Sequence, residues 1–436
     1  MTETRGHTDS PVFVVGIARS GTTLLAAMLS AHARLDCGPE SRFFARYRHL
    51  DGEQQRRALD PTRWPDPAVE FMASLRNQGH PVVELFGLSI DEVRGFLREQ
   101  PPSLAAMLES LTVLHAQRAG KARWVEKTPR HLLMTDALRR LWPAAAIVRI
   151  VRDPRDVALS LAGMPFAKDS VIGNLVRIDQ DDRRSRRRIE ADARAMTLRY
   201  EDLVSQPEHE LRRICSFIGE DYDADMLDRR ASAERVVAEH EWWKRPVAGP
   251  LETSRTGRWM REMEPDVQRF ASLHLAAHLR RHRYEGARQP AGRVTIVPVA
   301  DAVGPRNEQL LLDLARQDTV VRRPAPRDPS ALRRQRRLVF LGTRGQLDPS
   351  AGRPALHRVR SAVALAALLA LRRVRGRPVL WVRRATLRAR RTSDPGELNL
   401  AAWLRLLARQ VALEDVSPAV TAERASQLRT RPRRPG

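Results

Sequence analysis

The segment that most constrains the fold of this chain is PVFVVGIARSGTTLLAAML, which runs from Pro11 to Leu29. The continuous apolar, β-branched run over 12–15 predicts a buried strand, and the apolar residues at helical spacing over 24–29 predict a helix. A glycine-bounded loop over 16–23 separates the two. A strand, a tight loop and a helix in this order predict an α/β fold around a parallel sheet.

The loop has the chemistry of an anion site. A loop of this kind points successive backbone N–H groups and the positive end of a helix dipole at one small volume, which suits a phosphate or a sulfate. The spacing of Gly16 and Gly21 fits a P-loop, but Thr22 stands where a P-loop has its lysine. An ordinary strand-to-helix turn is the alternative. The candidate anion-binding residues are Arg19, Ser20, Gly21, Thr22 and Thr23.

A second strand, loop and helix follow in AAAIVRIVRDPRDVALS, residues 144–160. The run over 147–151 predicts a strand, and Asp153 followed by proline predicts the start of a helix. Arg152 lies at the strand's carboxyl end, and Ser160 lies seven residues after Asp153, on the helix face that begins beside Arg152. An arginine beside a hydroxyl makes a charge-assisted anion site. The alternative is a structural salt-bridge corner.

Two further residues suit acid–base or electrostatic chemistry. Lys127 in RWVEKTPRHLL precedes Thr128 and a proline, a helix start that puts Lys127 at a strand-to-helix junction on the same edge as the glycine loop. There it can neutralise charge that develops on a leaving group, or it is an exposed helix-start lysine. Glu40 follows the break at Gly38-Pro39 and can accept a proton from a hydroxyl, or it is a solvated surface residue.

The glycine loop, VGIARSGTTLL, resembles the 5′-phosphosulfate-binding loop of sulfotransferases that use 3′-phosphoadenosine 5′-phosphosulfate (PAPS), in the branch with bacterial and tyrosylprotein sulfotransferases. The resemblance covers about residues 11–280. It implies a P-loop-like parallel α/β core and transfer of a sulfuryl group from PAPS to an acceptor hydroxyl, with no metal. It also implies that 19–23 bind the 5′-phosphosulfate and that Arg152 and Ser160 bind the 3′-phosphate.

The same resemblance implies the catalytic roles. Residues 38–42 match the segment that carries the catalytic glutamate of the tyrosylprotein branch, which makes Glu40 the general base and Arg42 a substrate-site residue. Lys127 in its Lys-Thr-Pro setting corresponds to the lysine that assists the leaving group. His32 is a competing base because the cytosolic branch uses a histidine, but its place at the end of the first helix suits capping or packing.

Two later segments resemble parts of the family's nucleotide site. Residues 198–203 (LRYEDL) predict a strand with an acidic cap, and the resemblance puts Tyr200 near the nucleotide, whereas the alternative is an edge-strand tyrosine. Residues 253–259 (TSRTGRW) resemble the loop over the 3′-phosphate and adenine. That loop makes Gly257 and the two flanking arginines, Arg255 and Arg258, nucleotide-site candidates, and which arginine contacts phosphate stays open.

The other patterns are mainly helical. Residues 45–120 predict a helical insertion over the acceptor side, with helices over 90–97 and 104–114. The Arg-rich stretch 161–197 also predicts a helix with a solvated face. Further helices are expected over 208–218 and 263–278.

Charge and cysteine content narrow the function classes. From Gln289 onward there are 30 Arg and 11 acidic residues, so +19 of the formal net charge of +24 lies in the C-terminal part, and the core is only mildly basic. Only Cys37 and Cys215 are present, so no disulfide framework or cysteine metal site is expected. No apolar leader precedes the first strand, and the longest apolar run, 361–371, is too short to span a bilayer. A cytoplasmic protein is therefore expected, of unspecified oligomeric state.

The expected domains are a sulfotransferase domain over 11–286 and a second α/β unit over 290–425, between disordered ends at 1–10 and 426–436. Strands are predicted in the second unit over 294–298, 338–341 and 378–382, with helices over 307–316, 361–374 and 400–411. VTIVPVAD, RPVLWV and DVSPAVTAE resemble the N-terminal half of a two-domain glycosyltransferase. No catalysis is assigned to this unit.

The glycosyltransferase-like resemblance of the C-terminal unit prompts a carbohydrate or lipid hydroxyl as the acceptor. An atypical P-loop kinase or NTPase is the alternative enzyme class, but it needs a loop lysine and an acidic Mg²⁺ ligand at a strand end, where this chain has Thr22 and Arg152. A non-enzymatic protein that binds nucleic acid or another anionic surface through the basic tail is the third reading.

Overall fold

The structure is a computed structural model that describes residues 10–164 and 169–288 and, beyond them, 292–298, 312, 315, 319–322, 338–342 and 379–383. It divides into two compact units. The first comprises Met1–Glu262 with Arg281–Tyr284, and the second comprises Met263–Arg280 with Glu285–Gly436.

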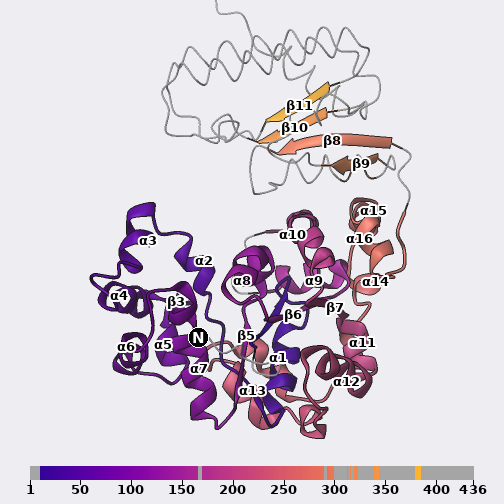
Figure 1. Cartoon of the computed structure of the whole chain (residues 1–436). Coiled ribbons are helices and arrows are strands. Elements are labelled where there is room, and N and C mark those ends of the chain that lie inside the picture. The colour runs from indigo at the N-terminus through magenta and orange to yellow at the C-terminus, as the bar shows by residue number, and fades with distance from the viewer. Residues whose placement is uncertain are drawn as a thin grey trace, which may run out of the picture. The chain divides into compact units, whose positions relative to one another are not determined.

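The first unit is built around a five-stranded, fully parallel sheet (Figure 1). The chain leaves β1 toward one edge of the sheet and leaves β6 toward the other, so neighbouring β1 and β6 flank a topological switch point, where α/β proteins bind ligands. This confirms the expected α/β class. In the order β2-β5-β1-β6-β7 the strands are Leu35–Cys37, Arg123–Lys127, Val12–Gly16, Ala146–Val151 and Ala195–Arg199.

Both faces of the sheet are covered, which is why β1 is an unbroken apolar run. Phe13 belongs to a core with the insertion helices, and its ring lies 5.6 Å from Trp124 and 5.2 Å from Trp142, centroid to centroid. Val14 belongs to the other core, with α1 (Thr22–Ala31) and α12 (Pro207–Ile218). Both cysteines are buried and form no disulfide.

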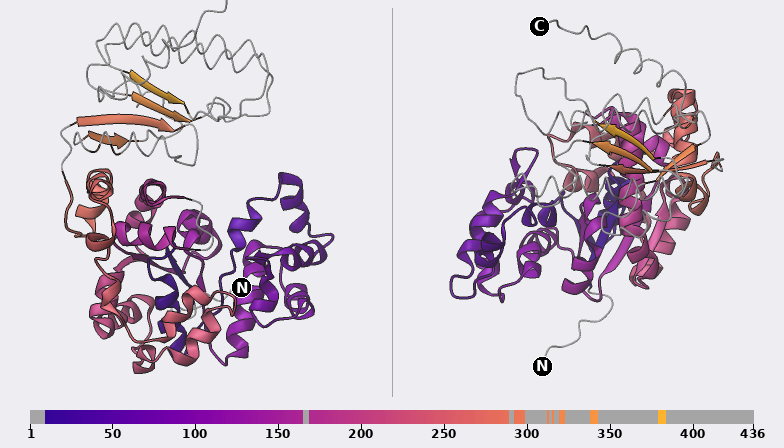
Figure 2. Two further views of the ribbon diagram at one scale, coloured as in Figure 1. Left: turned by 180° about the vertical axis from the view of Figure 1, so that it is seen from behind. Right: turned by 90° about the horizontal axis from the view of Figure 1, so that it is seen from above.

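The expected helical insertion is present, on one side of the sheet (Figure 2). Its two best-predicted helices are α6 (Ile90–Arg98), which begins with a capping box between Ser89 and Glu92, and α7 (Leu104–Arg118). The other helices of the insertion are α2 (Phe43–Tyr47), α3 (Gly52–Ala58), α4 (Asp66–Ser74) and α5 (Val82–Leu85). Two short strands, β3 (Arg76–Asn77) and β4 (His80–Pro81), pair with each other in antiparallel fashion.

The boundary predicted between a helix over 161–197 and a strand over 198–203 is wrong, because the helix α10 (Val171–Ala191) ends earlier and β7 begins at Ala195. The strand expected over 198–203 ends at Arg199, and Tyr200 begins a helix, α11 (Tyr200–Ser205). Glu201 and Asp202 in the first turn suit the positive end of that helix, so they mark a helix start.

The remaining elements of this unit are η1 (Pro129–Met134), α8 (Thr135–Leu141), α9 (Pro154–Ala162), α10 (Val171–Ala191), η2 (Ala224–Leu227), α13 (Arg230–Val236), η3 (Trp242–Ala248), η4 (Thr253–Arg255) and α14 (Trp259–Glu262).

The second unit contains a parallel four-stranded sheet in the order β11-β10-β8-β9. Three of its strands confirm predicted ones: β8 (Gly292–Pro298), β10 (Leu338–Gly342) and β11 (Val379–Arg383). The fourth, β9 (Thr319–Arg322), was not predicted. The helix expected over 263–278 is two helices, α15 (Pro265–His274) and α16 (Ala276–Arg281), which break at Leu275.

The helices expected between these strands fall largely outside the described residues, as does the last glycosyltransferase-like piece, so those assignments and the domain limits stay predictions. Within the part of the chain that the structure describes, no helix has the length and apolar character needed to cross a membrane.

Candidate active site

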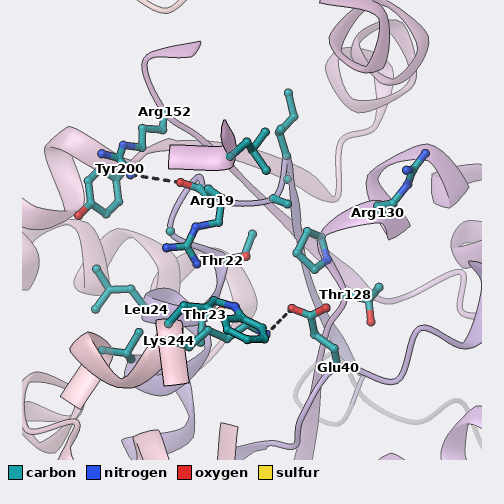
Figure 3. A pocket seen from close by; sticks show the side chains of 18 of the residues that line it. Arg19, Thr22, Thr23, Leu24, Glu40, Thr128, Arg130, Arg152, Tyr200 and Lys244 are labelled. Carbon is teal, nitrogen blue, oxygen red and sulfur yellow. Dashed lines mark hydrogen bonds and ion pairs between the residues drawn. The ribbon is translucent and has the colours of Figure 1, made fainter. Parts of the chain in front are cut away.

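The glycine turn after β1 and the arginine turn after β6 meet in space. The Nε of Arg19 donates a hydrogen bond to the Oγ of Ser160 on α9, at 3.1 Å. The Nη1 of Arg152 donates to the carbonyl oxygen of Arg19, at 3.2 Å (Figure 3). The loops lie together because β1 and β6 are paired in parallel and end at the same edge of the sheet.

A cavity of about 660 Å³ opens beside the two turns, a size typical of small-molecule sites. Its walls come from the sheet edge, the insertion and the chain between α13 and η4. Nine predicted site residues line it: Arg19, Gly21, Thr22, Thr23, Glu40, Arg42, Arg152, Tyr200 and Arg255. Ser20, Lys127, Ser160, Gly257 and Arg258 are not among the residues that line it.

The glycine turn has a backbone that few side chains tolerate. Arg19 and Gly21 both have positive φ, 73° and 99°. A Cβ on Gly21 would lie 2.5 Å from Cδ2 of Tyr200, so glycine lets that ring pack on the turn. No side chain caps the N-terminus of α1. The amides of its first turn are therefore available to an anion in the cavity.

Three arginines, Arg19, Arg152 and Arg255, lie close together at the glycine turn. Arg152 is 7% exposed, its guanidinium lies 4.6 Å from the centroid of the Tyr200 ring, and its Nη2 donates to the carbonyl of Arg255 at 2.5 Å. Burial, together with the charges of Arg152 and Arg255, lowers the pKa of Arg19. Like charges packed this closely favour binding of an anion between them.

The loop over 253–259 is fastened to α9 next to Arg152. The buried carboxylate of Asp156 accepts hydrogen bonds from the amides of Gly257, at 2.7 Å, and Trp259, at 2.9 Å. Arg258 forms an ion pair with Glu262, at 2.6 Å. Arg255 lines the cavity, whereas Arg258, which directly precedes α14, is paired with Glu262 at the end of that short helix.

Glu40 lies across the cavity from Arg152, and two lysines hold it. Its Oε1 accepts hydrogen bonds from Nζ of Lys127, at 3.2 Å, and from Nζ of Lys244, at 2.8 Å. Lys244 also contacts Oε1 of Glu241, at 2.7 Å. Burial alone would raise the pKa of Glu40, but Lys127 and Lys244 outweigh it and hold that pKa well below its usual range. Glu40 is therefore an ionised carboxylate.

Lys127 reaches Glu40 from inside the protein. It is the last residue of β5, its side chain is fully buried, and burial disfavours its charge, but Glu40 and Glu241 raise the net pKa of Lys127. The next residue, Thr128, is at the expected helix start, yet its hydroxyl donates to Glu126, at 2.6 Å, instead of capping η1.

A buried network next to Lys127 fixes the Glu40 segment against β5. Ser41 donates to the carboxylate of Glu126, at 2.7 Å, and the amide of Arg42 donates to the hydroxyl of Thr128, at 3.2 Å. These bonds hold the two residues that directly follow Glu40, so the position of the Glu40 carboxylate depends on the end of β5.

A model of the sulfotransferase family matches residues 11–224 of the chain. This part of the chain belongs to the sulfotransferase family. The matched range contains the five-stranded sheet, both turns and Glu40, and it ends before Lys244 and the 253–259 loop.

The chain is similar to curated proteins and to a solved structure. It is 25% identical over 268 residues to a putative protein-tyrosine sulfotransferase of Caenorhabditis briggsae, which covers 59% of this chain and 83% of that protein. It is 24% identical over 240 residues to the nodulation protein NoeE of Sinorhizobium fredii, over 48% of this chain and half of that protein. The sulfotransferase domain of the Synechococcus PCC 7002 olefin synthase has a TM-score of 0.43 at 19% identity, over 59% of this chain and 90% of that one.

Sequence reasoning missed two residues that line the cavity beside Glu40, Lys244 and Glu241. They lie in EWWKRP, a stretch without a strand or turn motif, and they meet Glu40 only through the tertiary fold.

His32 lies at the end of α1, the place that the sequence indicates for a capping or packing residue. Its Nε2 is 2.9 Å from the carbonyl of Asp221, at the C-cap of α1, and it is not among the residues lining the cavity.

Proposed function

We propose that the chain is a PAPS-dependent sulfotransferase that moves a sulfuryl group to an acceptor hydroxyl. The observation that carries this proposal is the contact between Arg19 and Ser160, because it brings the two anion-binding turns to one cavity. Two anion sites in a single cavity suit a nucleotide with phosphate groups at both ends.

The donor's 5′-phosphosulfate is assigned to residues 19–23 and its 3′-phosphate to Arg152, Ser160 and Arg255. The uncapped N-terminus of α1 supports the first assignment. The cluster of Arg19, Arg152 and Arg255, in which burial and the other two charges lower the pKa of Arg19, supports the second. Tyr200, packed on the glycine turn under Arg152, is assigned to the nucleotide, and Gly257 and Arg258 to the loop beside it.

In the proposed transfer, Glu40 accepts the hydroxyl proton as the acceptor oxygen attacks sulfur. Such a transfer depends on positioning and electrostatics, and the proposal needs no metal. The assignment of Lys127 to the leaving oxygen stays a prediction. The contact that supports a catalytic part for Lys127 is its ion pair with Glu40.

The acceptor is proposed to be a carbohydrate or lipid hydroxyl, with a tyrosine hydroxyl as the competitor because relatives are named protein-tyrosine sulfotransferases. The test is transfer of labelled sulfate from PAPS to a panel of oligosaccharides, glycolipids and tyrosine peptides, with detection of 3′,5′-bisphosphoadenosine (PAP). Labelled acceptor with stoichiometric PAP is expected. A protein that binds neither PAPS nor PAP and labels nothing would refute the proposal.

A further inference from the structure

Lys244 is the residue at the cavity that the proposed function leaves without a task. It lies on η3, which packs against α1, the helix that begins at the glycine turn. Among the lining residues in the described part of the chain, it is the single lysine. Because the glycine turn has Thr22 at the P-loop lysine position, Lys244 is the ammonium group available at the cavity wall.

The contacts of Lys244 join the general base to a buried anchor. Its Nζ contacts Glu40 at 2.8 Å and Glu241 at 2.7 Å. Glu241 is 1% exposed, and its other oxygen, Oε2, has no hydrogen-bond partner. The anchor can therefore keep hold of the ammonium group while the contact with Glu40 is exchanged for another.

The two lysines on Glu40 differ in their freedom to move. The side chain of Lys127 is fully buried at the end of β5, whereas that of Lys244 is 8% exposed and contacts Glu40 at the border of the cavity (Figure 3). A carboxylate held by two ammonium groups is a weak base, because both favour its ionised form. For Glu40 to accept a proton during transfer, one of these contacts must weaken, and Lys244 is the one that can turn toward a bound group.

We propose that Lys244 is a second catalytic lysine, which exchanges Glu40 for the sulfonate of the bound donor. The inference rests on the proposed function. The donor's sulfonate attracts the ammonium group of Lys244, which stays anchored to Glu241, and Glu40 becomes more basic as the acceptor hydroxyl arrives. Arrival of the donor thereby activates the base.

The proposed transfer step exchanges one bond to sulfur for another. A bond forms between the acceptor oxygen and sulfur, and the bond from sulfur to the oxygen that bridges it to phosphorus breaks. The bridging oxygen keeps the electron pair and leaves as part of PAP, and the hydroxyl proton passes to Glu40. Lys244 stabilises the negative charge on the sulfonate and the bridging oxygens, which grows during transfer.

The test compares two nucleotides that differ only in the sulfonate. Isothermal titration calorimetry measures PAPS and PAP binding to the full chain and to Lys244→Met, Lys244→Arg and Lys121→Met. Lys121 is the matched control, since its Nζ donates to the carbonyl of His32 and it is not among the residues lining the cavity. The affinity of Lys244→Met for PAPS should fall about 10- to 100-fold more than its affinity for PAP, as expected for the loss of a hydrogen bond to a charged group. Lys121→Met should lose none.

A pH profile of kcat/KM for labelled-sulfate transfer tests the coupling to the base. Glu40 faces Lys127 from β5, Lys244 from η3, Arg19 from the glycine turn and Arg42 from its own segment. Removing Lys244 should raise the pKa of Glu40, so the acid limb of the profile should move to higher pH in Lys244→Met and stay in place in Lys244→Arg. Equal effects of Lys244→Met on PAPS and PAP, or an unmoved acid limb, would overturn the inference. Failure of the unmodified chain to bind either nucleotide would instead refute the proposed function.

Discussion

At the scale of single residues, the site is governed by charges held within hydrogen-bond distance and away from water. Glu40 is 12% exposed and has two ammonium partners, while Arg19, Arg152 and Arg255 crowd together opposite it. In so little solvent, each charge depends on its neighbours to stay ionised.

Glu40→Gln tests the base directly. The amide keeps the shape and one hydrogen-bond acceptor but cannot take up a proton, so kcat should fall by about 10²- to 10⁴-fold. The measurement is labelled-sulfate transfer beside PAP affinity, with Glu53→Gln on the exposed α3 as the matched control. Unchanged PAP affinity is expected, and loss of PAP binding would give Glu40 a structural task instead.

The same carboxylate predicts a pH dependence of stability. The pKa of Glu40 in the folded protein lies below its ordinary value of 4.5, so its contribution to the free energy of unfolding is complete above pH 4.5 and is lost as the pH falls. Thermal denaturation between about pH 6 and pH 3 should show a steeper loss of Tm for the unmodified chain than for Glu40→Gln. Parallel curves would contradict the assigned ion pairs.

The sequence predicts those site residues that belong to local motifs. Glu40 follows a break in the chain and Arg152 follows a strand end, and the family resemblance of these two segments singles the residues out. Lys244 lies 204 residues from its partner Glu40 and has no motif around it. A contact of that kind depends on how η3 packs, which local patterns do not encode.

At the scale of elements, the glycine turn combines a left-handed backbone with a close ring contact. Gly21→Ala should destabilise the protein by about 1 kcal/mol for the positive φ and by a further 1–3 kcal/mol for the clash with Tyr200. Gly79→Ala is the matched control, because Gly79 has a similar φ of 92° and open space around it. Chemical denaturation should show a clearly larger loss of the free energy of unfolding for Gly21→Ala than for Gly79→Ala. Equal losses would mean that the ring moves aside at no cost.

The fastening of the 253–259 loop to α9 gives a second prediction at this scale. Asp156→Asn leaves one oxygen for two amides, so the loop that carries Arg255 should loosen. PAP affinity should fall about tenfold, while affinity for adenosine 5′-phosphosulfate, which lacks the 3′-phosphate, should change little. Asp91→Asn on the exposed side of α6 is the control. An equal loss for both nucleotides would argue against a 3′-phosphate site beside Arg152.

The elements that the sequence predicts well are those with a single strong pattern. β1 is an uninterrupted apolar run, and β6 is apolar apart from the buried Arg149. α6 has clear helical periodicity, and α6 and α7 both begin with serine caps. The start of α11 was misread because the apolar Leu198 and the aromatic Tyr200 alternate with charged residues, which continues a strand pattern past the end of β7. Helix and strand signals overlap there, and the tertiary contacts of Tyr200 decide between them.

At the scale of the whole molecule, the residues that line the cavity all lie between Gly16 and Arg255, whereas most of the net positive charge lies beyond Gln289. Removing residues 289–436 should therefore leave PAP affinity within about twofold of that of the full chain, as measured by calorimetry. The salt dependence of binding to a DNA duplex should weaken strongly in the shortened chain. A large loss of PAP affinity would show that the C-terminal part contributes to the nucleotide site.

The measurement that tests the account most directly is a crystal structure of the chain with PAP bound. We predict one molecule in the cavity, with its 5′-phosphate on the amides of residues 19–23 and its 3′-phosphate within hydrogen-bond distance of Arg152 and Ser160. PAP bound elsewhere, or with only one of its phosphates on these two turns, would contradict the claim that they grip opposite ends of one nucleotide.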